Sequence, residues 1–405
     1  MSYLSLVAKV EAGEDDKAVL LDAMLSATKV YNGLIWELRR EYEQSGKSRV
    51  SRSNLNRILK GLPRARGYYS LSVQATRDEV IGAYRSYFAL RKNGNKEVRP
   101  PGFRRKTRYS GLRYYDGYGF KVAGDFLTLS LGLSREDGVR QVRVRLQHRP
   151  GVEFRKVVSV LMTYDEKNGM EAHLVVDVED GKAQGTRKVA VDLGETQAIA
   201  AICDDGQGLL YSGRQVKAIR RYWQKVRTKV KPPTVEKRRK SKRFRQIERK
   251  ESRQVNHLLQ LISKNFVERC NEAGVDTIAI GELTNIRQNI DYGDHLNQRL
   301  HAWPFAKIAD MIEYKAQRYG IQVVKVCEAY SSQTCHACAQ VARSNRKTRG
   351  SYSCSCGWHA HADINSCANL FQTAFHVSPL KRSSGDVASP AVLSLITRRH
   401  TVCIA

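Results

Sequence analysis

Two closely spaced cysteine pairs set the strongest constraint on how this chain folds. Two residues separate Cys335 from Cys338 in SSQTCHAC, and one residue separates Cys354 from Cys356 in CSCGWHAH. The N-terminus lacks the basic and apolar regions of a secretion signal. Cysteines with this spacing in such a chain predict a metal site rather than disulfides. Four protein ligands leave no open position on zinc, so this zinc would stabilise the fold without taking part in catalysis.

The second pair leaves the identity of the fourth ligand open. Gly357 follows Cys356 as expected for a zinc knuckle, whereas Ala339 stands at the equivalent place after the first pair. A site using Cys356 and His359 would restore the usual spacing and leave Cys354 spare. Both four-cysteine and mixed sites are common in structural zinc centres. We predict Cys335, Cys338, Cys354 and Cys356 as ligands, with His359 as the possible substitute.

Three carboxylates stand where packing alone does not explain an acid. Asp192 ends the apolar strand VAV, Glu282 ends TIAIG, and Asp363 opens the apolar segment INSCANLF directly after the cysteine cluster. Any one of them alone is most simply a strand-end residue facing solvent. Three acids that converge would need cations, and oxygen ligands are those that Mg²⁺ prefers. Two such ions can hydrolyse a phosphodiester bond.

The charge of the chain indicates a polyanionic partner. Its 69 Lys and Arg residues outnumber 40 Asp and Glu residues, for a net charge of +29. A membrane surface is the less favoured partner, because no apolar run approaches the ~20 residues of a spanning helix. We therefore expect a nucleic-acid partner, no membrane, and a location in the prokaryotic cytoplasm or nucleoid.

Two basic stretches are candidates for nucleic-acid contact, although solvated surface is the simpler interpretation of any charge run. Residues 214–256 contain 18 Lys and Arg residues against three acids, and RRKTRYSGLRYY at 104–115 interleaves cations with tyrosines. Cations suit phosphates, and tyrosines suit stacking on bases. The residues chosen as examples are Arg104, Arg105, Lys106, Tyr114, Arg238, Arg239 and Lys240.

Hydrophobic periodicity divides the chain into three parts. Apolar residues recur at helical spacing over 16–43 and 71–90, and RPPGFRRK then ends the helical pattern. From about 120 to 180 the period is two, with a hairpin signal at Asn168-Gly169, which predicts an antiparallel sheet and a small barrel with one basic face. From 188 onward, three strands followed by alternating helices and strands predict a mixed α/β sheet.

Several segments resemble a known family. VAVDLGETQAIAA, IAIGELTNI and HADINSCANL are similar to the three motifs of the RuvC-type nuclease domain, as found in transposon-encoded TnpB nucleases and compact type V CRISPR effectors. PGFRRK and SSQTCHAC resemble further segments of that family, and Asn365 and Asn369 match its pattern after the third acid. The resemblance places Asp192, Glu282 and Asp363 at the catalytic, magnesium-binding positions. It also explains why the cysteines adjoin Asp363, since this family inserts a zinc ribbon before the helix that carries the third acid.

The resemblance implies a multidomain α+β fold. An N-terminal helical recognition unit and a small β-barrel (wedge) would precede an RNase H-like (RuvC) α/β nuclease domain with an inserted zinc ribbon. The expected parts are a first wedge strand (1–12), the helical domain (13–98), the wedge barrel (99–184), RuvC motifs I and II (185–330), the zinc ribbon (331–358), the final RuvC helix (359–376) and a flexible tail (377–405).

The function that the resemblance implies is RNA-guided DNA cleavage. Guide RNA, structural Zn²⁺ and catalytic Mg²⁺ are the expected cofactors, and target double-stranded DNA beside a short flanking motif is the substrate. The chain would act as a monomer or a homodimer on one guide RNA, supplied by a transposon end or a CRISPR array. The alternatives are a guide-bound DNA-binding regulator or transposition accessory protein that cuts little, and a guide-free nuclease or recombinase.

Overall fold

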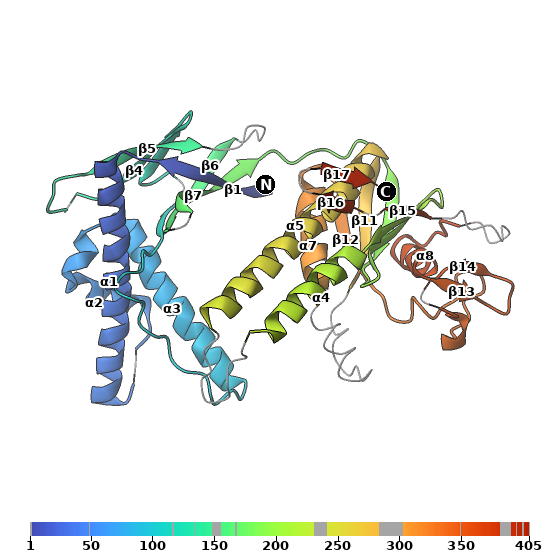
Figure 1. Ribbon diagram of the computed structural model, residues 1–405, viewed down its shortest axis with the longest axis horizontal. Helices are drawn as coiled ribbons and strands as arrows, with labels where there is room; N and C mark the ends of the chain where they lie inside the picture. The colour runs from blue at the N-terminus through green and yellow to red at the C-terminus, as the bar shows by residue number, and fades with distance from the viewer. Residues whose placement is uncertain are drawn as a thin grey trace. The chain divides into compact units, whose positions relative to one another are not determined.

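The computed structural model divides the chain into two compact units, Met1–Glu179 and Asp180–Ala405 (Figure 1). The structure describes residues 2–47, 49–115, 117–133, 135–147, 155–166, 168–230, 241–282, 303–348, 350–380, 390–393, 395–398 and 401–404.

Helices form the first part of the N-terminal unit, as the 3.6-residue period predicted. They are α1 (Glu14–Ser45), α2 (Arg52–Lys60) and α3 (Ser70–Lys92), with a 3-10 turn at Pro63–Arg66. Gly46 ends α1 in the left-handed conformation, and the Ser51 hydroxyl caps α2 by accepting a hydrogen bond from the Asn54 N–H. The apolar faces of α1 and α3 lie in one core, including Leu20, Met24, Leu34 and Val80.

A seven-stranded antiparallel sheet completes the N-terminal unit. Its order is β2-β6-β7-β1-β5-β4-β3. The strands are β1 (Ser2–Glu11), β2 (Leu112–Tyr115), β3 (Phe120–Ala123), β4 (Phe126–Ser130), β5 (Gln141–Gln147), β6 (Lys156–Asp165) and β7 (Gly169–Val178). A bridge between Tyr115 and Tyr118 brings the two edge strands together, so the sheet is nearly closed.

The register of this sheet follows from alternation and from the hairpin turn. Val142, Val144 and Leu146 on β5 are buried, while the arginines between them are exposed, which gives the predicted basic face. Asp165 pairs with Gly169 across the Asn168-Gly169 turn, as predicted. The N-terminal strand β1 lies in the middle of the sheet, antiparallel to both β5 and β7.

A six-stranded mixed sheet organises the C-terminal unit, in the order β12-β11-β8-β9-β10-β15. Its strands are β8 (Arg187–Asp192), β9 (Gln197–Cys203), β10 (Gly208–Ser212), β11 (Val275–Glu282), β12 (Gln322–Cys327) and β15 (Ala391–Leu393). The first three strands are antiparallel, and β11 runs parallel to both β8 and β12. This confirms the mixed α/β order predicted from the sequence.

Helices cover both faces of the mixed sheet. On one face, α5 (Lys242–Glu272) and α7 (Phe305–Gln317) pack against Val189, Val191 and Ile280. On the other face, α8 (Ala362–Phe375) packs against Ala190 and Ala279. The remaining helix of the described part of this unit is α4 (Arg214–Thr228), which packs along α5.

A small hairpin and a short strand complete this unit. The hairpin consists of β13 (Ser351–Ser353) and β14 (His359–His361), and it leads directly into α8 (Figure 1). The tail was predicted to be flexible, and its described residues include three short strands. There β15 pairs in parallel with β10, and β16 (Leu395–Arg398) pairs with β17 (Thr401–Ile404). The free edge of β10 supplies the backbone partners for β15, which is too short to show a period in the sequence.

Candidate active site and metal centre

Asp192 lies at the end of β8, on the sheet face that α8 covers. Side chains alternate along a strand, so Asp192 continues the series of Ala190, which packs against α8. Ser366 on α8 donates a hydrogen bond to the Asp192 carboxylate. Burial and then the charge of Asp363 nevertheless raise the pKa of Asp192 to about 6.

Asp363 lies in the first turn of α8, and its charge acts on Asp192. Its backbone N–H donates to the ring of His361, the residue that precedes the helix, at 3.3 Å. Arg346 binds the Asp363 carboxylate at 2.9 Å, and the positive charge of Arg346 also acts on Asp192. The structure therefore brings two of the three predicted acids into electrostatic contact, with one arginine as their counter-ion.

Glu282 is placed differently. It ends β11 two positions after Ile280, whose side chain packs on the α5 and α7 face. Alternation gives Glu282 that same face, opposite Asp192, and the residue is exposed. Among the described residues, no cluster of metal-ligand atoms within 4.8 Å of one another contains Asp192, Glu282 and Asp363. The assignment of Glu282 to the site stays a prediction.

Glu328 is an acid near the site that sequence reasoning missed. It follows β12 by one residue and is half-buried. Burial raises the pKa of Glu328 to about 7, and the charge of Asp192 acts in the same direction. The signal that could have found it is an acid directly after the apolar strand IQVVKVC, the same pattern that drew attention to Asp192 and Glu282.

The four cysteines meet in one cluster. Cys335, Cys338, Cys354 and Cys356 bring their sulfur atoms within 4.8 Å of one another, and His359 is not part of this group. The Cys335–Cys356 and Cys338–Cys354 sulfur distances are 3.6 and 3.7 Å. Four sulfur atoms about 2.3 Å from one zinc ion lie roughly 3.8 Å apart in a tetrahedron. The arrangement fits a zinc ion and is far too open for disulfides.

Ionisation of all four thiols would require a cation. Hydrogen bonding from the backbone of Cys356 lowers the pKa of Cys354 to about 7, while burial raises the pKa of Cys335. Four thiols this close together cannot all ionise unless a cation neutralises them.

Two asparagines fasten the cysteine cluster to α8. The Asn365 side-chain oxygen accepts hydrogen bonds from the His336 N–H at 3.2 Å and from the Trp358 indole at 3.1 Å. The Asn365 amide donates to the Thr334 carbonyl, and Asn369 donates to the carbonyls of Ser331 and Thr334, each at 2.8 Å. The helix that carries Asp363 therefore also fixes the first cysteine pair.

The predicted nucleic-acid residues have mixed outcomes. Arg105 and Lys106 are exposed, and Arg238, Arg239 and Lys240 lie outside the described residues. The prediction for Tyr114 is wrong, because the ring is completely buried and its hydroxyl donates to the Ser130 carbonyl.

Arg104 is also committed to the fold. Its guanidinium bonds to Glu79 at 2.7 Å and lies over the Tyr31 ring, with 18% of the side chain exposed. It is therefore not displayed for phosphate contact in this structure.

The helices α4 and α5 present an exposed basic surface. Trp223 donates to Gln254 at 2.6 Å and Arg227 bonds to Glu251, which holds the two helices together. The exposed cations of this α4–α5 surface are Arg214, Arg221, Lys225, Lys229, Lys242, Arg243, Arg245, Arg249, Lys250 and Arg253.

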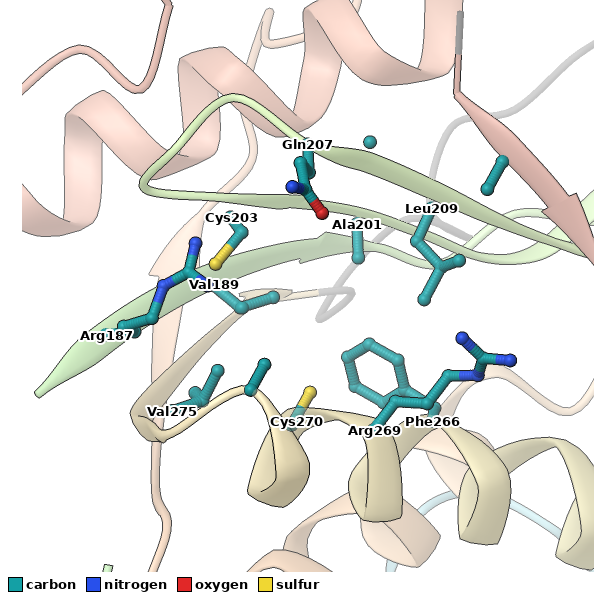
Figure 2. A pocket seen from close by; sticks show the side chains of 13 residues that line it. Arg187, Val189, Ala201, Cys203, Gln207, Leu209, Phe266, Arg269, Cys270 and Val275 are labelled. Carbon is teal, nitrogen blue, oxygen red and sulfur yellow. The ribbon is translucent and has the colours of Figure 1, made fainter. Parts of the chain in front are cut away.

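A pocket of about 230 Å³ lies on the α5 face of the sheet (Figure 2). Val189, Ala201 and Phe266 line it together with Arg187 and Arg269. Cys203, Asp204 and Asp205 also gather here, but Arg187 bonds to both carboxylates and offsets part of their charge. This second acidic group is thus an ion-pair cluster.

Two family models match the segments that contain the acids and the cysteine cluster. Residues 305–370 match the model described as "Cas12f1-like, TNB domain", and residues 173–287 match the model described as "Probable transposase". Over 389 residues the chain is 26% identical to a TnpB-like protein of Acidianus two-tailed virus, covering 88% of this chain and 83% of that protein. The chain is therefore similar to TnpB-like proteins and compact type V effectors.

The chain shows two further similarities of the same kind. It is 34% identical over 109 residues to the CRISPR-associated endodeoxyribonuclease Cas12f1 of Sulfoacidibacillus thermotolerans, covering 27% of this chain and 24% of that protein. It superposes on Cas12f1 in a Cas12f1-sgRNA-target DNA complex with a TM-score of 0.60 and 16% identity, covering 88% of this chain and 83% of that one. The second similarity shows a shared fold. Among the described residues, no helix is both long and apolar enough to span a membrane.

Proposed function

We propose that this TnpB-like chain is an RNA-guided DNA endonuclease that cuts at one RuvC-type site containing Asp192 and Asp363. The observation that carries the proposal is the electrostatic interaction between these acids, one at the end of β8 and one at the start of α8. Relatives named as endodeoxyribonucleases, and a matching fold solved with guide RNA and target DNA, support it.

The acids suit divalent metal binding in their charge and chemistry. Asp192 and Asp363 raise each other's energy when ionised, and the charge of Arg346 offsets part of this repulsion. Oxygen ligands of this kind favour Mg²⁺, which when bound would activate water and stabilise the leaving oxygen of a phosphodiester. The role of the chain is to fix the carboxylates on a rigid strand and helix so that they hold the metal in place.

The cysteine cluster would hold one zinc ion with a structural role. Its four ligands leave no position for a substrate. The asparagine contacts to α8 transmit the order of the ribbon to the helix that carries Asp363.

The exposed α4–α5 surface would hold phosphates of the guide or the target. Such contacts add affinity without reading sequence, which base pairing with the guide would supply. Affinity should therefore fall as salt rises.

The test measures target binding and target cutting separately for the chain purified with its RNA. Asp192→Ala and Asp363→Ala should keep guide and target binding, while cutting falls by orders of magnitude because metal stabilisation worth several kcal/mol is lost. Chelation of Mg²⁺ should have the same effect. Normal cutting by either variant would refute the proposal. If the unmutated chain itself binds its target but does not cut it, a guide-bound regulator would be favoured instead.

A further inference from the structure

We propose that Glu328, rather than Glu282, supplies the third carboxylate of the site that contains Asp192 and Asp363. The inference rests on the proposed function and concerns which residues hold the divalent metal. It is carried by the register of three neighbouring strands and by the space above one glycine.

Strand register places Glu328 on the same face as Asp192. Ile280 pairs with Val191, and Gly281 pairs with Val326. Asp192 follows Val191 and Gly281 follows Ile280, so Asp192, Gly281 and Val326 lie side by side across the sheet. They share the α8 side, where Val326 packs. Glu328 lies two residues after Val326. Because side chains alternate along an extended chain, the Glu328 side chain points to this side as well.

The same register places Glu282 on the other side. Glu282 pairs with Cys327, which is two residues after Lys325. Lys325 bonds to Glu313 of α7 at 3.7 Å, so this row of side chains faces α7. A single residue of offset along a strand thus separates Glu282 from the two aspartates by the thickness of the sheet.

Gly281 leaves the space that Glu328 occupies. A β-carbon at position 281 would lie 2.6 Å from Glu328 Oε2 and 3.3 Å from the β-carbon of Glu328. The Glu328 carboxylate therefore lies over Gly281, next to the strand that ends in Asp192. Because glycine has no side chain, position 281 leaves room for the carboxylate of the next strand.

The surroundings of Glu328 fit a metal ligand better than a structural ion pair. Its carboxylate makes no hydrogen bond or ion pair with any residue that the structure describes, although it is half-buried. The charge of Asp192 acts on it, which places it within electrostatic reach of the site. A half-buried carboxylate without a partner is costly unless a cation is supplied.

The experiment compares Glu328→Gln with Glu282→Gln, which remove one charge each and keep the side-chain volume. The first readout is Mn²⁺ binding to the RNA-free full chain, followed by electron paramagnetic resonance of free Mn²⁺. The second is DNA cutting by the guide-bound chain. We expect Glu328→Gln to weaken Mn²⁺ binding about tenfold and cutting about a hundredfold or more, because it removes a direct metal contact. Glu282→Gln should stay within about threefold of wild type in both.

Two further variants protect the test against misfolding. Glu328→Asp keeps the charge but shortens the side chain, and Gly281→Ala leaves Glu328 intact but displaces its carboxylate. Both should weaken Mn²⁺ binding, with an unfolding midpoint close to that of wild type in the absence of metal. Loss of binding in Glu282→Gln, or wild-type binding in Glu328→Gln, would overturn the assignment. Normal cutting by Asp192→Ala would instead refute the proposed function, whatever Glu328 does.

Discussion

The cysteine cluster and the carboxylate site both consist of groups that are negatively charged when ionised. The two sites differ in what holds these groups together against their repulsion. The cysteines lie in a ribbon with a small core of its own, formed around Tyr352 and Trp358. The acids lie at the ends of strands and at the start of a helix that belong to a large packed unit. We therefore expect the ribbon to need a bound metal to fold, whereas the sheet can hold the acids together without one.

This difference predicts opposite effects on protein stability when one group is removed from each site. Removing a cysteine should destabilise the protein, because the metal is part of the folded ribbon. Removing an acid should stabilise the metal-free protein, because packing already holds the acids against their repulsion. The predictions below test this contrast, from the largest expected effect to the smallest.

Loss of one zinc ligand should have the largest effect. Wild type should bind close to one zinc ion per chain, and Cys354→Ser should lose it along with the ordered ribbon, since structural zinc contributes about 10 kcal/mol or more of apparent folding energy. Zinc content and protease cleavage within residues 331–358 measure both effects.

His359→Ala is the matched control for the zinc prediction, because His359 lies outside the sulfur cluster. It should keep its zinc and its resistance to protease. The opposite pattern, with zinc lost in His359→Ala and kept in Cys354→Ser, would establish the mixed-ligand site instead.

Breaking the link between the two sites should come next. Asn365→Ala leaves the buried His336 N–H and the Trp358 indole without acceptors, at a cost of about 4 kcal/mol. The zinc ligands are intact, so zinc content should stay at the wild-type value while the unfolding midpoint in urea falls. Equal loss of zinc would show that the ribbon cannot form apart from α8.

Removal of Asp192 should act in the opposite direction. Its folded pKa is about 6 against an ordinary value of 3.8, so the folded state holds the proton more tightly than the unfolded state does. The stability from this group is present below pH 3.8 and is lost as the pH rises through 6. At pH 7 without divalent metal, Asp192→Asn should therefore be more stable than wild type by up to about 3 kcal/mol.

Urea unfolding at a series of pH values checks this prediction. The advantage of Asp192→Asn should disappear at low pH, where the carboxyl group of wild type is protonated. A variant that is less stable at pH 7 would mean that the ionised Asp192 is a structural acid held by its hydrogen bond from Ser366.

The smallest expected effect concerns the first cysteine pair. Ala339 has a φ of 62°, a left-handed conformation that glycine adopts without strain, as Gly357 does after the second pair with a φ of 89°. Ala339→Gly should stabilise the ribbon by about 1 kcal/mol. Resistance of zinc to a competing chelator measures the gain, and a faster loss of zinc would contradict it.

The sequence by itself determined the elements whose signal is local. The period of 3.6 predicted α1 and α3, alternation predicted the buried valines of β5, and Asn168-Gly169 predicted the turn between β6 and β7. The cysteine spacing identified the four residues of the sulfur cluster, although only the structure separated Cys354 from His359. These features need no information from distant parts of the chain, because each is fixed by neighbouring residues.

Only the tertiary structure decided which side chains meet. Tyr114 and Arg104 were predicted to contact nucleic acid. In the folded chain Tyr114 is buried, and Arg104 forms an ion pair with Glu79. Glu282 and Glu328 both follow apolar strands and look alike in the sequence. The register of β11 and β12 assigns them to opposite faces, and a slip of β11 by one residue would move Glu282 to the face that Glu328 occupies. Register is set by pairing between strands far apart in the chain, so no local pattern can reveal it.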